Sequence, residues 1–172
     1  MRKTTAVAAA ALITATPALA MDLTSPDVRE GAPIAKEQVY TRCGGGNVSP
    51  ALSWSGAPAN TKSFAITAID TNVPPHKWTH WVVVGVPPTT TSLGKGARPP
   101  AGAQILPSDF GEAAYDGPCP PPGSGVHHYV FTVWALSAAT IAFPHGATAD
   151  DIDKALTKAS LAHASVTGTY ER

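Results

Sequence analysis

YDGPCPPPGSGVHHYVFTVWAL, the stretch from Tyr115 to Leu136, carries the most specific pattern in the chain. Its first half is rich in glycine and proline, and because proline has a fixed φ and no N–H donor, residues 118–123 are predicted to form a loop. The second half, from Val126 onward, is aromatic and β-branched, as is typical of a strand. A stiff loop joined to a strand can hold His127 at the edge of a pocket, which a binding site for a small polar group requires.

The side chains of this predicted strand divide between two faces, because successive residues of a strand point in opposite directions. Tyr129, Phe131 and Val133 fall on one face, whereas His128, Val130, Thr132 and Trp134 fall on the other.

The length of 172 residues and the hydrophobic content of 44% suit one domain with a proper core. Residues 1–20 combine two basic residues, an apolar stretch and the small-residue sequence Ala18-Leu19-Ala20, which together predict a secretory signal peptide cleaved after Ala20. The alternative is an N-terminal membrane anchor, but threonines and Pro17 interrupt the apolar stretch and leave it short of about 20 spanning residues. The expected organisation is therefore a signal peptide, 1–20, and a single domain, 21–172.

Charge and cysteine content narrow the function classes. The full chain has 12 basic and 12 acidic residues, and removal of Arg2 and Lys3 leaves a formal net charge of −2. There is no basic field for a phosphate backbone, so nucleic acid is not an expected partner. The predicted signal peptide indicates export, and no second apolar segment is long enough to span a bilayer, so we expect a periplasmic or secreted protein. In that setting Cys43 and Cys119 are expected to form a disulfide, with free thiols as the alternative.

Glycine and proline punctuate the rest of the chain at strand-like intervals, which indicates a mainly β protein. The runs Ser63 to Asp70 and Thr79 to Val86 are predicted strands, and Val166 to Tyr170 a short last one. Near the C-terminus, Thr148 is a predicted helix cap, because acidic residues and then apolar residues at helical spacing follow it. The connection from Thr89 to Gly111 shows no pattern that predicts its shape.

Three polar residues stand at the ends of the predicted strands. Asp70 ends one strand, His80 lies near the start of the next, and His127 near the start of a third. If these ends meet, they surround a small cavity in which imidazoles and loop N–H groups suit an oxyanion such as phosphate. Structural roles are also open: His80 could be a buried imidazole bonded to backbone carbonyls, and Asp70 an Asx-turn residue. Trp54, Trp81 and Trp134 are predicted core residues, and His76, His145 and His163 are predicted surface residues.

Four ordered motifs resemble those of the phosphatidylethanolamine-binding protein family, whose bacterial branch is called Raf-kinase-inhibitor-like. They are NVSPALSW from Asn47, the segment from Asp70 to His80-Trp81, GPCPP from Gly117, and HHYVF from His127. The similarity extends over nearly the whole mature chain, from about residue 23 to residue 171.

This resemblance implies an antiparallel β-sandwich with one C-terminal helix and a small pocket for anions such as phosphate or phosphorylated head groups. The family's turn usually reads Asp-Pro-Asp-Ala-Pro, whereas here it reads Asp70-Thr71-Asn72-Val73-Pro74, so an amide replaces the second carboxylate. This replacement should make the pocket less negative. The implied ligand-binding residues are Asp70, Asn72, Trp78, His80, Cys119, Pro121, His127 and Tyr129.

The expected function is therefore an exported, non-catalytic binding protein for a phosphate-containing small molecule or phospholipid head group, with no cofactor and no metal. His80 and His127 are expected to donate to the ligand oxyanion, with Asp70 orienting one imidazole. One alternative is an inhibitor of a protease or kinase that binds a protein target through the same surface. A hydrolase or a metal-binding protein is another alternative, although no serine elbow, HExxH motif or P-loop accompanies the acidic and histidine residues.

Overall fold

The computed structural model describes residues 20–172. The predicted signal peptide, residues 1–20, lies outside the described residues except for Ala20. No helix within the described range is long and apolar enough to cross a membrane.

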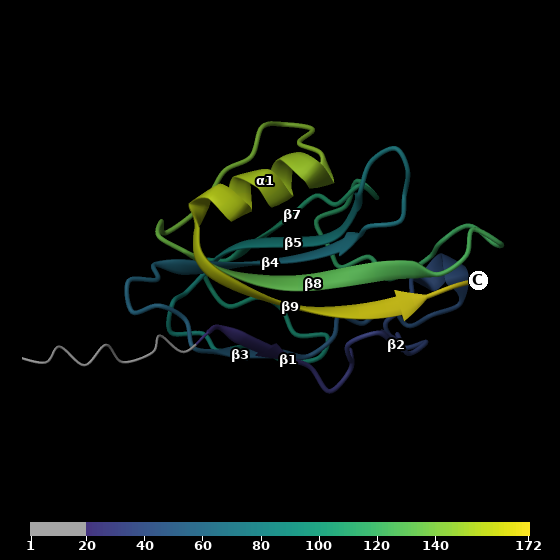
Figure 1. Cartoon of the computed structure of the whole chain (residues 1–172), viewed down its shortest axis with the longest axis horizontal. Helices are drawn as coiled ribbons and strands as arrows, with labels where there is room; N and C mark the ends of the chain where they lie inside the picture. Colours follow the sequence, from purple (N-terminus) through teal and green to yellow (C-terminus); the bar gives the residue numbers. More distant parts are fainter. Residues whose placement is uncertain (1–19) are drawn as a thin grey trace, which may run out of the picture.

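Two sheets form the framework, as the predicted sandwich requires. The larger sheet has six strands in the order β2-β9-β8-β4-β5-β7, and the smaller has three in the order β1-β3-β6. In Figure 1 the small sheet lies against one face of the large sheet, and the helix α1 covers the other face. All strand pairs are antiparallel except β2 with β9. The large sheet comprises β2 (Ala32–Pro33), β4 (Ser63–Asp70), β5 (Trp78–Val86), β7 (Gln104–Leu106), β8 (His127–Leu136) and β9 (Ser160–Tyr170), and the small sheet β1 (Asp22–Thr24), β3 (Leu52–Ser55) and β6 (Ser92–Leu93).

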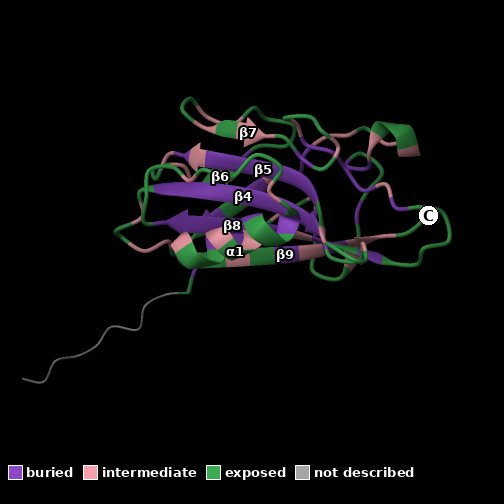
Figure 2. Cartoon of the chain, turned by 90° about the horizontal axis from the view of Figure 1, so that it is seen from above, coloured by how far each residue is buried: buried purple, intermediate pink, exposed green. Residues whose placement is uncertain are grey.

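The central strand β4 is buried along its whole length because both of its faces are covered (Figure 2). Phe64 and Ile66 join the core between the two sheets, whereas Ala65 joins the core beneath α1. The same division holds for β8, as its alternation predicted: Tyr129, Phe131 and Val133 lie in the inter-sheet core, and Trp134 lies beneath the helix. Trp54 and Trp81 are also buried, as predicted.

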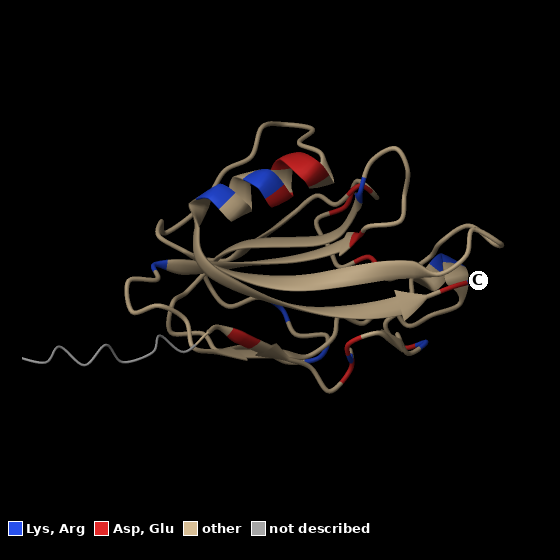
Figure 3. Ribbon diagram, viewed as in Figure 1, with Lys and Arg blue, Asp and Glu red and all other residues tan. Residues whose placement is uncertain are grey.

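The predicted helix is α1, Ala149–Ala159, and it begins where its sequence indicated. The Thr148 side chain accepts from the Asp151 N–H, and the Asp151 carboxylate accepts from the Thr148 N–H, which together form a capping box. Acidic residues occupy the first turn (Figure 3), where the helix dipole favours negative charge. Ile152 and Leu156 are buried against the sheet, so the apolar face of the helix is the one that packs.

Two segments differ from the sequence prediction. The last strand, β9, is longer than the predicted Val166 to Tyr170, since it begins at Ser160. Apart from Leu161, its first half consists of serine, alanine and histidine residues with little strand preference, and its pairing along the full length of β8 supplies the missing stabilisation. The connection from Thr89 to Gly111 contains two short strands, β6 and β7, whose partners β3 and β5 are remote in sequence.

Candidate functional site

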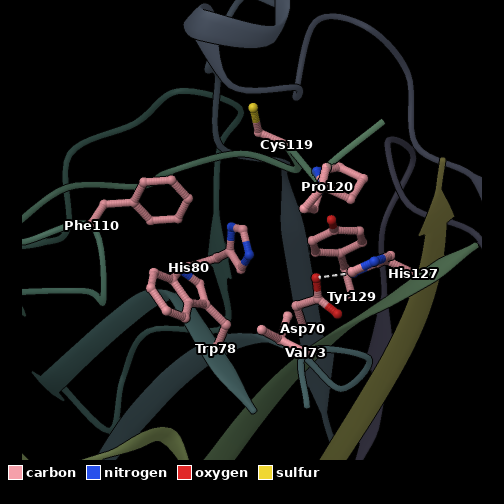
Figure 4. Close-up of a pocket in the computed structure, with 10 residues that line it drawn as sticks. Asp70, Val73, Trp78, His80, Phe110, Cys119, Pro120, His127 and Tyr129 are labelled. Carbon is pink, nitrogen blue, oxygen red and sulfur yellow. Dashed lines mark hydrogen bonds and ion pairs between the residues drawn. The ribbon is translucent and has the colours of Figure 1, made fainter. Parts of the chain in front are cut away.

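The predicted site residues meet at one end of the large sheet. β4 ends at Asp70, and because β5 and β8 run antiparallel to β4, both of these strands begin beside that residue. Asp70 pairs with Trp78 of β5 on one side and with Tyr129 of β8 on the other. His80 and His127 belong to the same two strand starts, so side chains that are distant in sequence surround one space (Figure 4).

This space is a cavity of about 280 Å³. Every residue predicted to bind a ligand lines it except Asn72, and the structure adds three residues that the sequence did not indicate: Val73, Phe110 and Pro120. The complete lining is Asp70, Val73, Trp78, His80, Phe110, Cys119, Pro120, Pro121, His127 and Tyr129. The walls are thus mainly apolar, with a few polar side chains, and contact of these residues with a ligand stays a prediction.

Asp70 and His127 form a buried pair at the base of the cavity. The Asp70 and His127 residues are only 2% and 4% exposed, and His127 Nδ1 lies 2.6 Å from Asp70 Oδ2 (dashed line in Figure 4). Asp70 Oδ1 accepts from the Asn72 N–H at 2.9 Å, which is the bond of an Asx turn. Asp70 therefore has both roles that its sequence position allowed: it orients an imidazole, and it closes the turn after β4.

The second ring nitrogen of His127 also has a partner. His127 Nε2 lies 2.9 Å from Ser124 Oγ, and the same hydroxyl lies 2.7 Å from the Pro121 carbonyl oxygen. Both nitrogens are therefore engaged within the protein, and His127 has no spare N–H for a ligand in this arrangement. The predicted donor role of His127 toward an oxyanion would require Ser124 to move away. The sequence pattern did not indicate Ser124, although this residue follows directly on the predicted loop, 118–123.

His80 is arranged differently. Its Nδ1 lies 2.7 Å from the Asp116 carbonyl oxygen, which can only accept, so Nδ1 carries the hydrogen. Burial lowers the pKa of His80, and the contact with the Asp116 carbonyl opposes this shift only in part. The neutral ring thus presents Nε2 as an acceptor, and within residues 20–172 this atom has no hydrogen-bond partner. The rings of Phe110 and Tyr129 pack around His80 at centroid distances of 5.2 and 5.0 Å.

Tyr129 contributes a buried hydroxyl to the same cavity wall. Among the described residues, this hydroxyl forms no hydrogen bond of acceptable geometry, although it lies toward the Asp70 carboxylate and the Cys119 N–H. Burial, with a smaller contribution from the charge of Asp70, raises the pKa of Tyr129 far above its usual value. Tyr129 is therefore a neutral phenol that can donate one hydrogen bond.

Asn72, the residue that replaces a carboxylate, does not line the cavity. Its side-chain oxygen accepts from the His128 N–H at 3.0 Å and lies 2.9 Å from His128 Nδ1. Asn72 therefore joins the turn after β4 to the start of β8. Asn72 is exposed and lies outside the cavity lining, so a direct contact of Asn72 with a ligand stays a prediction without geometric support.

The loop over the cavity is fixed by contacts with a segment before β3. A disulfide joins Cys119 to Cys43, at the end of the 3₁₀ helix Thr41–Cys43, with a Cα–Cα distance of 5.6 Å. The Gly117 N–H donates to Asn47 Oδ1 at 2.8 Å, and Asn47 Nδ2 donates to the Tyr115 carbonyl at 3.0 Å. A Cβ at Gly117 would lie 2.0 Å from the Gln38 carbonyl oxygen, so only glycine fits this close approach. The predicted disulfide is thus present and holds the rim of the cavity.

Phe110 is the cavity residue that sequence reasoning had least chance to find. It belongs to the irregular connection from Thr89 to Gly111, where no periodicity marks an inward side chain. Its ring packs on Tyr40 at 4.9 Å and on Trp78 at 6.0 Å, so it closes one side of the cavity. A single aromatic residue in a polar, glycine-containing loop was the one available signal. Within the described range, no cluster of three or more histidine, cysteine, aspartate or glutamate side chains could hold a metal ion.

A two-sheet β fold with a small, mainly apolar cavity and a few buried polar groups at one sheet end defines a class of small-ligand binding domains. The phosphatidylethanolamine-binding protein family model matches residues 24–171, and the chain belongs to this family. Among its relatives, the UPF0098 protein YbcL of Escherichia coli is 39% identical over 163 residues, covering 90% of this chain and 89% of YbcL. LppC of Mycobacterium tuberculosis, which carries the name "Putative lipoprotein LppC", is 37% identical, and the match covers 88% of this chain and 72% of LppC.

Solved structures agree with this assignment. The crystal structure of E. coli YbcL, described as a member of the mammalian PEBP family, has a TM-score of 0.81 and 37% sequence identity, covering 88% of this chain and 98% of that one. The structure of CT736 from Chlamydia trachomatis, described as a PEBP homolog, has a TM-score of 0.72 and 34% identity, covering 89% and 98%. The expected family and fold class are thereby confirmed.

Proposed function

We propose that this protein is an exported binding protein whose cavity accepts a small anion, namely a phosphate-containing molecule or a phospholipid head group, without changing it chemically. The observation that carries the proposal is the buried Tyr129 hydroxyl, which forms no hydrogen bond within residues 20–172 and is the one of four such buried atoms, among the described residues, whose residue lines this cavity. His80 Nε2, an acceptor that no described residue engages, belongs to the same cavity wall. Because a buried polar group without a partner is costly, such a hydroxyl supports a site that a ligand completes.

The Tyr129 hydroxyl and His80 Nε2 together suit a ligand that has both a hydrogen-bond acceptor and a donor. The Tyr129 phenol donates, so it suits a phosphate oxygen. Neutral His80 accepts at Nε2, so it suits a P–OH group or an ammonium group of the same ligand. The nearby Asp70 carboxylate disfavours a dianion and also suits a ligand that carries a positive charge. A phosphate monoanion or a zwitterionic head group satisfies all three residues.

The expected effect of pH follows from His80. Protonation turns Nε2 into a donor and adds a positive charge, so anion binding should strengthen as the pH falls. Since burial lowers the pKa of His80, this strengthening should appear on the acid side of the usual histidine range.

The cavity size favours a head group over a whole lipid. Its volume of about 280 Å³ is at the small end of ligand pockets. Trp78, which is 38% exposed, and Phe110 flank the cavity and offer apolar contact to the atoms that adjoin a head group.

Export is part of the proposal and draws on separate observations. The Cys43–Cys119 disulfide suits an oxidising compartment outside the cytoplasm. The lipoprotein name of LppC and the predicted signal peptide agree with it.

The test is calorimetric titration of the oxidised protein with phosphate, phosphoethanolamine and a soluble short-chain phosphatidylethanolamine. We expect saturable binding that Tyr129→Phe weakens by about ten-fold, because this change removes one hydrogen bond and keeps the ring. Tyr115→Phe is the matched control, since Tyr115 is a buried tyrosine outside the cavity whose hydroxyl already donates to the Gln38 carbonyl. An equal effect of both changes, or no binding of any of the three compounds, would contradict the proposal. The three arms separate free phosphate from a head group and a head group from a lipid.

A further inference from the structure

A serine beside the cavity completes a hydrogen-bonded chain that begins at Asp70. Ser124 Oγ lies 2.9 Å from His127 Nε2, and His127 Nδ1 lies 2.6 Å from Asp70 Oδ2. A hydroxyl, an imidazole and a buried carboxylate in this order form the arrangement of an activated serine nucleophile. We propose that Ser124 is a covalent modification site that small activated esters acylate, with His127 as its general base and Asp70 as the residue that orients the base.

The direction of proton transfer follows from counting hydrogens. Asp70 accepts from the Asn72 N–H and from His127 Nδ1, and an ionised carboxylate can only accept. With the hydrogen on Nδ1, the neutral ring has its lone pair on Nε2. Ser124 has one hydrogen for two acceptors, and in the structure it donates to the Pro121 carbonyl at 2.7 Å. Rotation of this hydroxyl toward His127 Nε2, 2.9 Å away, gives the reactive state, in which Nε2 is placed to remove the hydrogen.

The three hydrogen-bonded residues differ in burial in the way that a reactive serine requires. Asp70 and His127 are 2% and 4% exposed, so packing holds the base and its partner in place, whereas Ser124 is exposed and open to a reagent. Gly123 and Gly125, on either side of Ser124, have φ values of +75° and +86°, which other residues rarely adopt. The two glycines produce the sharp turn that projects the serine outward and back toward His127.

The backbone around Ser124 also holds the loop and offers a donor. The Gly123 N–H donates to the Arg172 carbonyl at 2.8 Å, which fixes the loop to the end of the chain. The Gly125 N–H has no protein acceptor among the described residues. The residue after a nucleophilic serine commonly supplies an N–H to the oxyanion of the tetrahedral intermediate, and Gly125 has this position.

The cavity sets the class of reagent. Pro121 and His127 line it and both contact Ser124, so the serine, which is not itself a lining residue, lies beside the cavity wall. The volume of about 280 Å³ and the apolar walls from Trp78 and Phe110 suit a short, uncharged acyl chain. This property goes beyond the proposed anion binding and does not depend on it.

The reaction balances without a further reagent. Ser124 Oγ attacks the ester carbonyl carbon while its proton passes to His127 Nε2, which forms the new C–O bond and a tetrahedral oxyanion. The bond to the leaving oxygen then breaks, and His127 returns the proton to that oxygen. The products are an alcohol or phenol and an acyl ester of Ser124.

The experiment exposes the oxidised protein to p-nitrophenyl acetate and measures acetylation of each serine by peptide mass spectrometry over time. Ser137 is the internal control, because it is exposed and its hydroxyl donates only to the Ala159 carbonyl at 3.4 Å, among the described residues. We expect Ser124 to be acetylated about one hundred-fold faster than Ser137, the low end of what a positioned general base contributes. Equal rates at the two serines would overturn the proposal without any variant.

Two variants sharpen the result. Ser124→Ala, at an exposed position, should abolish the rapid release of p-nitrophenol, whereas Ser137→Ala should leave it unchanged. Asp70→Asn, with its fold checked by circular dichroism, should slow acetylation of Ser124 by about ten-fold or more because the imidazole loses its orienting carboxylate. If rapid release of p-nitrophenol persists in Ser124→Ala, the reaction belongs to another residue. If Ser124 in folded Asp70→Asn is acetylated at the wild-type rate, Asp70 does not orient His127 for this reaction.

Discussion

Two regions of the six-stranded sheet contain buried polar side chains, and the hydrogen bonding of these side chains differs between the two regions. On the face beneath α1, Trp134 Nε1 donates to Thr67 Oγ1 at 3.1 Å, and Ser63 Oγ donates to the Ala138 carbonyl at 2.7 Å. At the cavity end, the Tyr129 hydroxyl is buried without a hydrogen-bond partner in residues 20–172. An unpaired buried polar group costs about 1–3 kcal/mol. The first region therefore serves stability, whereas the second retains an unfavourable arrangement that supports a ligand site.

The largest expected effect is on the helix face. Leu156 is fully buried in the core beneath α1, so Leu156→Ala should lower the free energy of unfolding by about 3 kcal/mol through lost burial and a cavity. Urea unfolding with the disulfide intact measures it. The matched change at the cavity end is Phe110→Ala, which removes a half-buried ring and should cost about 1 kcal/mol while weakening ligand binding. Equal losses of stability would show that the two regions do not differ as described.

A smaller loss of stability is expected when the hydrogen bond from Trp134 to Thr67 is removed. Trp134→Phe removes the Nε1 donor and leaves the buried Thr67 hydroxyl without it, so the free energy of unfolding should fall by about 2 kcal/mol. Urea unfolding again supplies the measurement, and a ligand titration should show unchanged affinity. A variant as stable as the wild type would mean that this hydrogen bond contributes nothing to the helix face.

A gain in stability, not a loss, is expected for a change at Tyr129, which lies in the same strand as Trp134, β8. Tyr129→Phe removes a hydroxyl that has no hydrogen bond within residues 20–172, so the free energy of unfolding should rise by about 1 kcal/mol. The same variant should bind phosphate more weakly. Thermal unfolding of the ligand-free protein measures the first effect. A clear loss of stability would show that the hydroxyl has a structural partner, such as an ordered water, and would weaken the contrast between the regions.

The sequence predicted those parts of the molecule whose signals are local. The bounds of β4 and the cap at Thr148 follow from alternation, turn residues and capping chemistry, which act over a few positions. The convergence of Asp70 with His127 depends on the register of β4 against β8, and a register between distant segments is not written in either segment. Resemblance to a family supplied that information.

The site residues that were missed lie where no periodic signal exists. Phe110 stands in an irregular connection, and Ser124 between two glycines of a turn, so neither position indicates which way its side chain points. The assignment of His127 as a ligand donor also depended on something that sequence cannot show, namely that Ser124 already occupies Nε2. Hydrogen-bond partners across turns are a property of the folded loop and not of residue type.

The smallest expected effect concerns pH and distinguishes His80 from a surface histidine. Burial lowers the pKa of His80 in the folded state below its unfolded value of about 6.5. Above that pH both states are neutral and His80 gives no pH dependence. As the pH falls below it, the unfolded state takes up the proton first, so stability decreases, and the decrease levels off below the folded-state pKa. One group contributes at most one proton to this slope.

Urea unfolding of wild type and His80→Gln across this pH range should therefore show a steeper loss of stability toward acid in the wild type. His145→Gln, at an exposed position, should leave the slope unchanged. Phosphate should reduce the wild-type loss, because a bound anion favours the protonated imidazole, and identical slopes with and without phosphate would place His80 outside the ligand site.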